Sequence, residues 1–206
     1  YADNTLAYAT AVSDAWNNPQ WATYLLRKLL ENDTFKKDFI NRYADLLNTA
    51  FLPSRVVAVI DRCQQAIAAE MPAHIARWGR PGSIGDWNYH VNVTRDFANR
   101  RPDYARSHLR SYFGLGQDRQ LTLDVADRTH GFIRVNRTDI NAQTPGVNPQ
   151  EPYPWSGLYF EDVPITVTAV PAPGYRFSHW QGPVAAEDMD LPTLTVQLAE
   201  DMALTA

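Results

Sequence analysis

Residues 171–177 read Pro-Ala-Pro-Gly-Tyr-Arg-Phe, which is a tight turn followed by an alternating run. Gly174 tolerates the positive φ angle that such a turn needs, and Tyr175 and Phe177 fall on one face of an extended segment. A turn of this kind between two apolar runs is typical of a β-sheet. The stretch therefore predicts that the C-terminal half of the chain is a β-rich module.

Short alternating runs continue on both sides of this turn. Proline, glycine or polar residues separate them, as they separate strands in small sheets. We expect the runs 121–125 and 131–135 to pair as a hairpin. Residues 141–156 are rich in proline, asparagine and glycine and predict a long loop. The other predicted strands are 158–160, 165–170, 175–180, 194–198 and 203–205.

The first half of the chain has a helical period instead. Apolar residues recur there at spacings of three and four, and proline or capping residues mark the helix ends. We expect Asn18 and Asp33 to cap the first two helices, Ser83 to cap the fifth and Gly114 to end the sixth. The predicted helices begin near residues 19, 34, 53, 72, 84 and 102, and the fifth ends near residue 100.

Charge divides the chain at the same place. Residues 1–115 carry 14 Lys and Arg against 11 Asp and Glu, a net charge of +3, whereas residues 116–206 carry 5 against 12, a net charge of −7. Together with the change of period, this predicts a segregated α+β fold. We expect an all-helical subdomain over residues 1–115 and a small antiparallel β-rich domain over residues 117–206.

Composition excludes several kinds of site. Cys63 is the only cysteine, so an internal disulfide and a zinc site built on several cysteines are excluded. Its place in an apolar helical pattern predicts a small buried side chain. No apolar run is long enough to span a bilayer. Because the chain starts at Tyr1 with neither a Met nor a signal peptide, we expect it to be trimmed from a longer protein.

Catalytic, cofactor-binding and metal-binding residues are not predicted. The chain has no P-loop, no nucleophile elbow, no histidine pair at ligand spacing and no pair of carboxylates suited to acid–base chemistry. Three aromatic residues, Trp155, Tyr159 and Trp180, are candidates for stacking on a sugar. The core interpretation is favoured for them, because a domain of about ninety residues without disulfides needs large aromatics in its core.

A basic cluster lies between residues 90 and 110. It suggests phosphate or nucleic-acid binding, but the interleaved Asp96 and Asp103 favour a solvated helix face, so we expect no nucleic-acid partner. The cluster consists of His90, Arg95, Arg100, Arg101, Arg106, His108 and Arg110.

Residues 25–32, Leu-Leu-Arg-Lys-Leu-Leu-Glu-Asn, and residues 39–49 resemble the C-terminal helical part of the CotH family, the spore-coat-protein-H-type atypical kinases. The resemblance continues in family order through residues 71–79, 100–102 and 108–113. In that family, the ATP-positioning Lys and the metal-binding Asp residues precede the matched segment. The resemblance therefore implies ATP and Mg²⁺ or Mn²⁺ for a parent kinase, an upstream kinase core as partner, and a non-catalytic role for this fragment.

Residues 164–169 and 174–182 are similar to the bacterial surface repeat related to the internalin B-repeat, which has the pattern Gly-Tyr-x-Phe-x-x-Trp-x-Gly. This resemblance implies a structural or surface-attachment unit and a secreted or cell-surface, extracytoplasmic location. One alternative is an adhesion module that binds a carbohydrate or a protein on a surface, with the helices as a spacer. Another is that the helices form an independent protein-interaction bundle.

Overall fold

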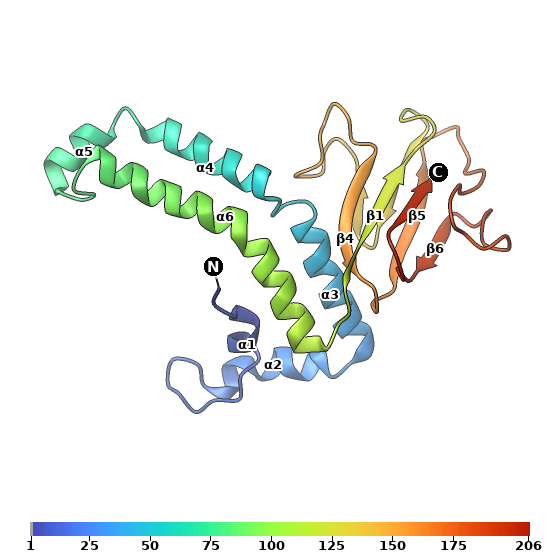
Figure 1. Ribbon diagram of the computed structural model, residues 1–206, viewed down its shortest axis with the longest axis horizontal. Coiled ribbons are helices and arrows are strands. Elements are labelled where there is room, and N and C mark those ends of the chain that lie inside the picture. The colour runs from blue at the N-terminus through green and yellow to red at the C-terminus, as the bar shows by residue number, and fades with distance from the viewer. Residues whose placement is uncertain (1) are drawn as a thin grey trace.

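The computed structural model describes residues 2–206 and shows six helices followed by two small sheets, which confirms the segregated α+β fold (Figure 1). The helices are α1 (Thr5–Ala9), α2 (Gln20–Leu30), α3 (Asp33–Leu47), α4 (Pro53–Ile67), α5 (Met71–Trp78) and α6 (Ile84–Phe113). The strands are β1 (Asp118–Asp124), β2 (Gly131–Val135), β3 (Thr138–Ile140), β4 (Trp155–Phe160), β5 (Ile165–Pro171), β6 (Thr193–Val196) and β7 (Met202–Thr205).

Capping residues set several helix ends as the sequence predicts. The Ser83 hydroxyl accepts a hydrogen bond from the Asp86 N–H at 3.0 Å and starts α6, and Gly114 ends it with a φ of 66°. Two predicted caps are wrong. Asn32, not Asp33, caps α3, and the Asn18 amide donates to the Tyr8 carbonyl at 2.8 Å instead of capping α2.

The two helices predicted for residues 84–100 and 102–113 are one helix of 30 residues with Pro102 inside it. Proline cannot donate to the Ala98 carbonyl one turn earlier, so the helix is expected to bend there. Figure 1 shows α6 changing direction along its middle. Ala98 and Ala105 are buried on either side of the proline, so packing keeps both halves in one helix.

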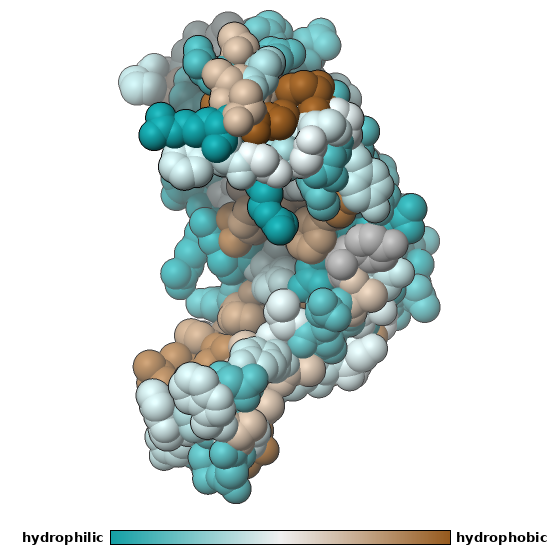
Figure 2. Space-filling model, turned by 90° about the vertical axis from the view of Figure 1, so that its left-hand side faces the viewer, coloured by the Kyte–Doolittle hydropathy of each residue, from teal (hydrophilic) through white to brown (hydrophobic). Residues whose placement is uncertain are grey.

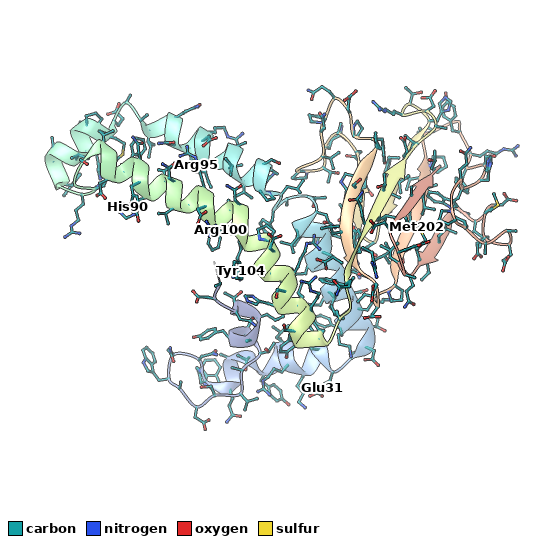
Figure 3. All side chains as sticks on the ribbon, viewed as in Figure 1. Glu31, His90, Arg95, Arg100, Tyr104 and Met202 are labelled. Atoms are coloured by element: carbon teal, nitrogen blue, oxygen red, sulfur yellow. The ribbon has the colours of Figure 1, made fainter. Side chains whose placement is uncertain are left out.

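α4, α5 and the first half of α6 form an arm, residues 53–100, that extends away from the sheets (Figure 1). Arg95 lies between α6 and α4 (Figure 3), where its guanidinium lies 2.6 Å from Asp61 and donates to Gln64 at 2.5 Å. No residue of α4 is buried, because no third layer covers the arm. Cys63, predicted to be buried on this helix, is therefore exposed, and that part of the prediction was wrong.

The seven strands form two sheets. One sheet has the order β4-β1-β7, with β1 antiparallel to β4 and parallel to β7, and the other has the antiparallel order β3-β2-β5-β6. The predicted hairpin between 121–125 and 131–135 is wrong, since β1 and β2 belong to different sheets. Their apolar side chains are buried in a common core, which covers more apolar surface than an isolated hairpin would.

The strand predicted for residues 175–180 is also absent from the described chain. Only the neighbouring Gln181 forms a bridge, with Thr205. The Trp180 N–H donates to the Met189 carbonyl at 2.8 Å, and its indole N–H donates to the Leu191 carbonyl at 2.9 Å. Loop carbonyls thus take the place of a strand partner. Conversely, β3 was not predicted, because three residues are too few to show alternation.

Helices and sheets share one hydrophobic core. Ile40 and Ala44 from α3 and Leu109 from α6 belong to the same buried cluster as the inward side chains of both sheets. Residues 114–117 form the short link between α6 and β1. The β half is therefore packed directly on the end of the helical half, while the arm points away from it (Figure 1).

Candidate functional site

A polar face of α3 contacts the β half. Asn41, Asp45 and Asn48 lie at i, i+4 and i+7, so they share one side of the helix. The Asn41 amide donates to the Pro164 carbonyl at 2.9 Å, and the Asp45 carboxylate accepts from the Tyr159 hydroxyl at 2.8 Å. We call these three side chains, together with Arg106 of α6, the polar seam.

Asn48 pairs with β4 as another strand would. Its side-chain oxygen accepts from the Leu158 N–H at 3.0 Å, and its amide donates to the Leu158 carbonyl at 2.9 Å. The buried Arg106 guanidinium donates to the Asn48 oxygen at 2.6 Å and to the Leu158 carbonyl at 3.0 Å. These bonds cover the free edge of β4 and fix the β half to two helices.

Asp45 is the one buried carboxylate of the seam. Burial raises its pKa to about 6, although hydrogen bonds from Asn136 and Tyr159 and the nearby charge of Arg42 act in the opposite direction. Its second oxygen has no hydrogen-bond partner among residues 2–206. Burial also lowers the pKa of Arg106. The seam therefore holds ionisable groups at a cost in desolvation.

The three aromatic candidates are buried. Trp155 and Tyr159 lie on β4, and Trp180 lies in the loop that follows residue 175. The structure does not bring them to a common surface: the Tyr159 hydroxyl bonds to Asp45 in the seam, and the Trp180 indole bonds to a loop carbonyl. Tyr175 is the aromatic residue of this region that is exposed, by 51%.

Arginines of the basic cluster bond within the chain. Arg100 pairs with Asp96 at 2.8 Å, and Arg110 pairs with Asp118 at 3.2 Å. Arg101 donates to the Asp3 carbonyl at 2.7 Å. Since Arg95 and Arg106 are also engaged, these charges stabilise the helices and their junction with β1 rather than forming one open cationic face.

Apolar side chains are exposed over the helical half. Leu30 of α2 is buried, but other apolar side chains of this helix face solvent, with Trp21 78% exposed and Leu25 69% exposed. Trp16 in the preceding loop is 93% exposed. Figure 2 shows a hollow between the arm and the lobe that α1 and α2 form, with apolar residues on both walls. We call the exposed apolar side chains of residues 8–29 and of the arm the apolar helical surface. Its members are Tyr8, Val12, Trp16, Trp21, Tyr24, Leu25 and Leu29, and in the arm Ile67, Trp78, Ile84, Tyr89, Val93 and Phe97.

A groove continues this surface at the bend of α6. It has a volume of about 460 Å³ and lies between α3, α4 and α6. Leu46, Phe51, Phe97 and Pro102 are among its lining residues, and almost all of its wall is apolar. The small side chains of Ala98 and Ala105, with the bend beside them, leave this space open.

No group of side chains among the described residues points to a site for ATP with Mg²⁺ or Mn²⁺. A metal ion at the phosphates is usually held by one or two carboxylates, with a cation placed over the phosphates. Residues 2–206 contain no group of three histidine, cysteine or acidic side chains arranged to hold a metal ion. No described residue is therefore assigned to these cofactors. The described helices also include none with the length and apolar character of a membrane span.

Two family models match the sequence. The one described as CotH kinase protein matches residues 3–105, half of the chain. The one described as divergent InlB B-repeat domain matches residues 137–206. No curated protein and no solved structure matches the chain. The central strands β1 and β2 fall between the two matched regions.

Proposed function

The chain belongs to the CotH kinase protein family over residues 3–105, and from this we propose that its helices are a supporting, non-catalytic part of a CotH-like kinase. The described residues contain no group of three or more His, Cys, Asp or Glu side chains that could hold a metal ion, which supports this role. The chemistry of phosphoryl transfer would then reside in a kinase core outside residues 1–206.

The apolar helical surface carries this proposal. A soluble monomer rarely exposes large contiguous apolar patches, and such patches mark surfaces that another protein segment covers. Trp16 and Trp21 are the most exposed tryptophans of the chain. Tryptophan is enriched among the residues that anchor interfaces. We propose that a kinase core covers these side chains.

The hollow in Figure 2 suggests how the core sits. The arm forms one wall and the α1–α2 lobe forms the other, so a compact body between them would contact both. Each large apolar side chain covered in this way contributes about 1.5–3 kcal/mol. A few such contacts are enough to fix the position of a kinase core.

The β half acts, in this proposal, as a structural unit at a fixed place. The polar seam and the shared core hold it against α3 and α6, so it is not attached by a free linker. Its similarity to the divergent InlB B-repeat domain supports a role in a protein displayed outside the cytoplasm. We therefore propose that the β half attaches the protein to a surface.

Substitution of Leu25 tests the docking. Leu25→Ser is compared with Leu191→Ser, which alters a leucine of the β half that is 48% exposed. In the full-length kinase, we expect Leu25→Ser to lower the Tm and the activity, and Leu191→Ser to leave both unchanged. In residues 1–206 alone, both variants should keep the Tm of the parent sequence, since both side chains face solvent there. An equal response of the two variants in the full-length kinase would refute the docking.

A further inference from the structure

The β half contains a pocket that the supporting role does not use. It lies where the turn after β1 meets the ends of β2 and β5 and the segment from Tyr175 to Gln181. Its volume is about 230 Å³. Pockets for drug-sized ligands begin at roughly 300 Å³, so this space suits one small ring or one unit of a polymer.

An exposed aromatic ring forms one wall of the pocket. Tyr175 is 51% exposed, and the His130 ring stacks on it with a centroid separation of 4.0 Å and an interplanar angle of 23°. The His130 imidazole stacks on the phenol, and about half of the Tyr175 residue stays exposed at the pocket. Phe132 and Phe177, partly buried against the core, extend the apolar wall.

Neighbouring groups hold His130, which stacks on Tyr175, in place before any ligand binds. The Asp127 carboxylate lies 3.3 Å from the His130 ring and accepts from the backbone N–H of Thr129 at 2.8 Å and from its hydroxyl at 2.6 Å. The Ala172 N–H donates to the His130 carbonyl at 2.7 Å and joins the two turns. A wall fixed in this way loses little conformational entropy on binding.

The polar lining is balanced in charge. Asp127 supplies a carboxylate, Arg176 a guanidinium and Gln181 an amide, so the lining includes both donors and acceptors. Residues 116–206 carry a net charge of −7, which repels anionic polymers. A neutral ligand with many hydroxyl groups suits this lining better than a nucleic acid or a phosphate does.

We propose that this pocket binds a neutral saccharide unit. The apolar face of the sugar ring stacks on Tyr175, and its hydroxyl groups bond to Asp127, Arg176 and Gln181. The sequence suggested three other aromatic residues for stacking on a sugar, but these are buried: Trp155, Tyr159 and Trp180. Tyr175, in contrast, is exposed. With one stacking ring and a few hydrogen bonds, a Kd on the order of 1 mM is expected.

Titration of the whole chain with neutral oligosaccharides tests the proposal. The probes are cellotetraose, maltotetraose and chitotetraose, followed by saturation-transfer NMR. Tyr175→Ala is compared with Tyr89→Ala, which removes an exposed tyrosine on α6 that is 63% exposed. We expect at least one probe to bind and Tyr175→Ala to weaken its binding at least about tenfold. Tyr175→Trp should keep the binding, because it keeps an aromatic ring at this position. Tyr89→Ala should leave the binding unchanged.

Arg176→Ala is a second variant that leaves the aromatic wall intact and should weaken binding of the same probe. Equal unfolding curves for all variants separate a loss of contact from a loss of folding. The proposal is overturned if no probe binds at about 10 mM, if Tyr175→Ala binds as the parent sequence does, or if an acidic oligosaccharide binds more tightly than the neutral ones. None of these outcomes depends on the kinase role, which the Leu25 variants test separately.

Discussion

Asp45 combines hydrogen bonds that join α3 to the β half with a burial that is unfavourable for its charge. Its carboxylate accepts hydrogen bonds from Tyr159 and Asn136, yet its burial leaves the second oxygen without a partner among the described residues. Buried ionic groups of this kind often stabilise little and instead favour one arrangement over others. Asp45 lies on the face of α3 that meets β4.

The pH dependence of stability follows from this burial. The pKa of Asp45 rises from 3.8 to about 6 on folding, so the folded state binds the proton more tightly than the unfolded state. This stabilisation is fully present below pH 3.8 and is lost as the pH rises through about 6. The difference is about 3 kcal/mol.

Urea unfolding of the parent sequence and of Asp45→Asn across this pH range measures the effect. The free energy of unfolding of the parent sequence should fall relative to that of Asp45→Asn as the pH rises, because the variant cannot ionise at this position. Parallel pH profiles for the two proteins would show that Asp45 does not titrate in this way.

Asn48 is the seam residue whose loss should be most damaging. Asn48→Ala leaves the Leu158 N–H and carbonyl and one Arg106 donor without this partner, and unpaired buried groups cost about 1–3 kcal/mol each. We expect the variant to lose about 2–4 kcal/mol in the free energy of unfolding. Asn99→Ala, on an exposed face of α6, should change it by less than about 0.5 kcal/mol. Similar losses in both variants would contradict the strand-like role of Asn48.

The seam is only half visible in the sequence. Asn41, Asp45 and Asn48 interrupt an apolar helical stripe at helical spacing, and that pattern could have marked a buried polar face. Their partners in the β half are 91 or more residues away, and no local pattern specifies such a pairing. The sequence alone therefore does not single out Asp45.

At the scale of elements, local signals predicted most helices and strands but not how they combine. Pro102 was interpreted as a helix start, although burial on both sides keeps α6 continuous. β1 and β2 were recognised as strands, yet their partners follow from packing between two sheets. Residues 175–180 alternate as a strand would, but loop carbonyls take up the Trp180 donors.

β1 and β2 decide whether the repeat can fold without the preceding chain. β1 lies between β4 and β7, and β2 lies between β3 and β5, but both precede the matched repeat, residues 137–206. A fragment of residues 137–206 would leave β4 and β7 without β1, and β3 and β5 without β2. We expect it to give a poorly dispersed NMR spectrum, while residues 1–206 give a dispersed one. A folded spectrum for the fragment would show that β1 and β2 are dispensable.

At the scale of the whole molecule, the junction between the two halves is buried, whereas the apolar helical surface is exposed. The junction between the helices and the β half is closed by a shared core and a polar seam. The arm and the α1–α2 lobe expose apolar side chains around a hollow (Figure 2). The first junction lies within this chain, and we propose that a kinase core covers the second surface.

Phosphoryl transfer by residues 1–206 alone tests the central claim most directly. The chain is incubated with labelled ATP, Mg²⁺ or Mn²⁺ and a serine-rich acceptor, with heat-denatured chain as the control. A supporting, non-catalytic part predicts no transfer above the control with either metal. Robust transfer to the acceptor by residues 1–206 would contradict the claim, because it would place the catalytic groups within these residues.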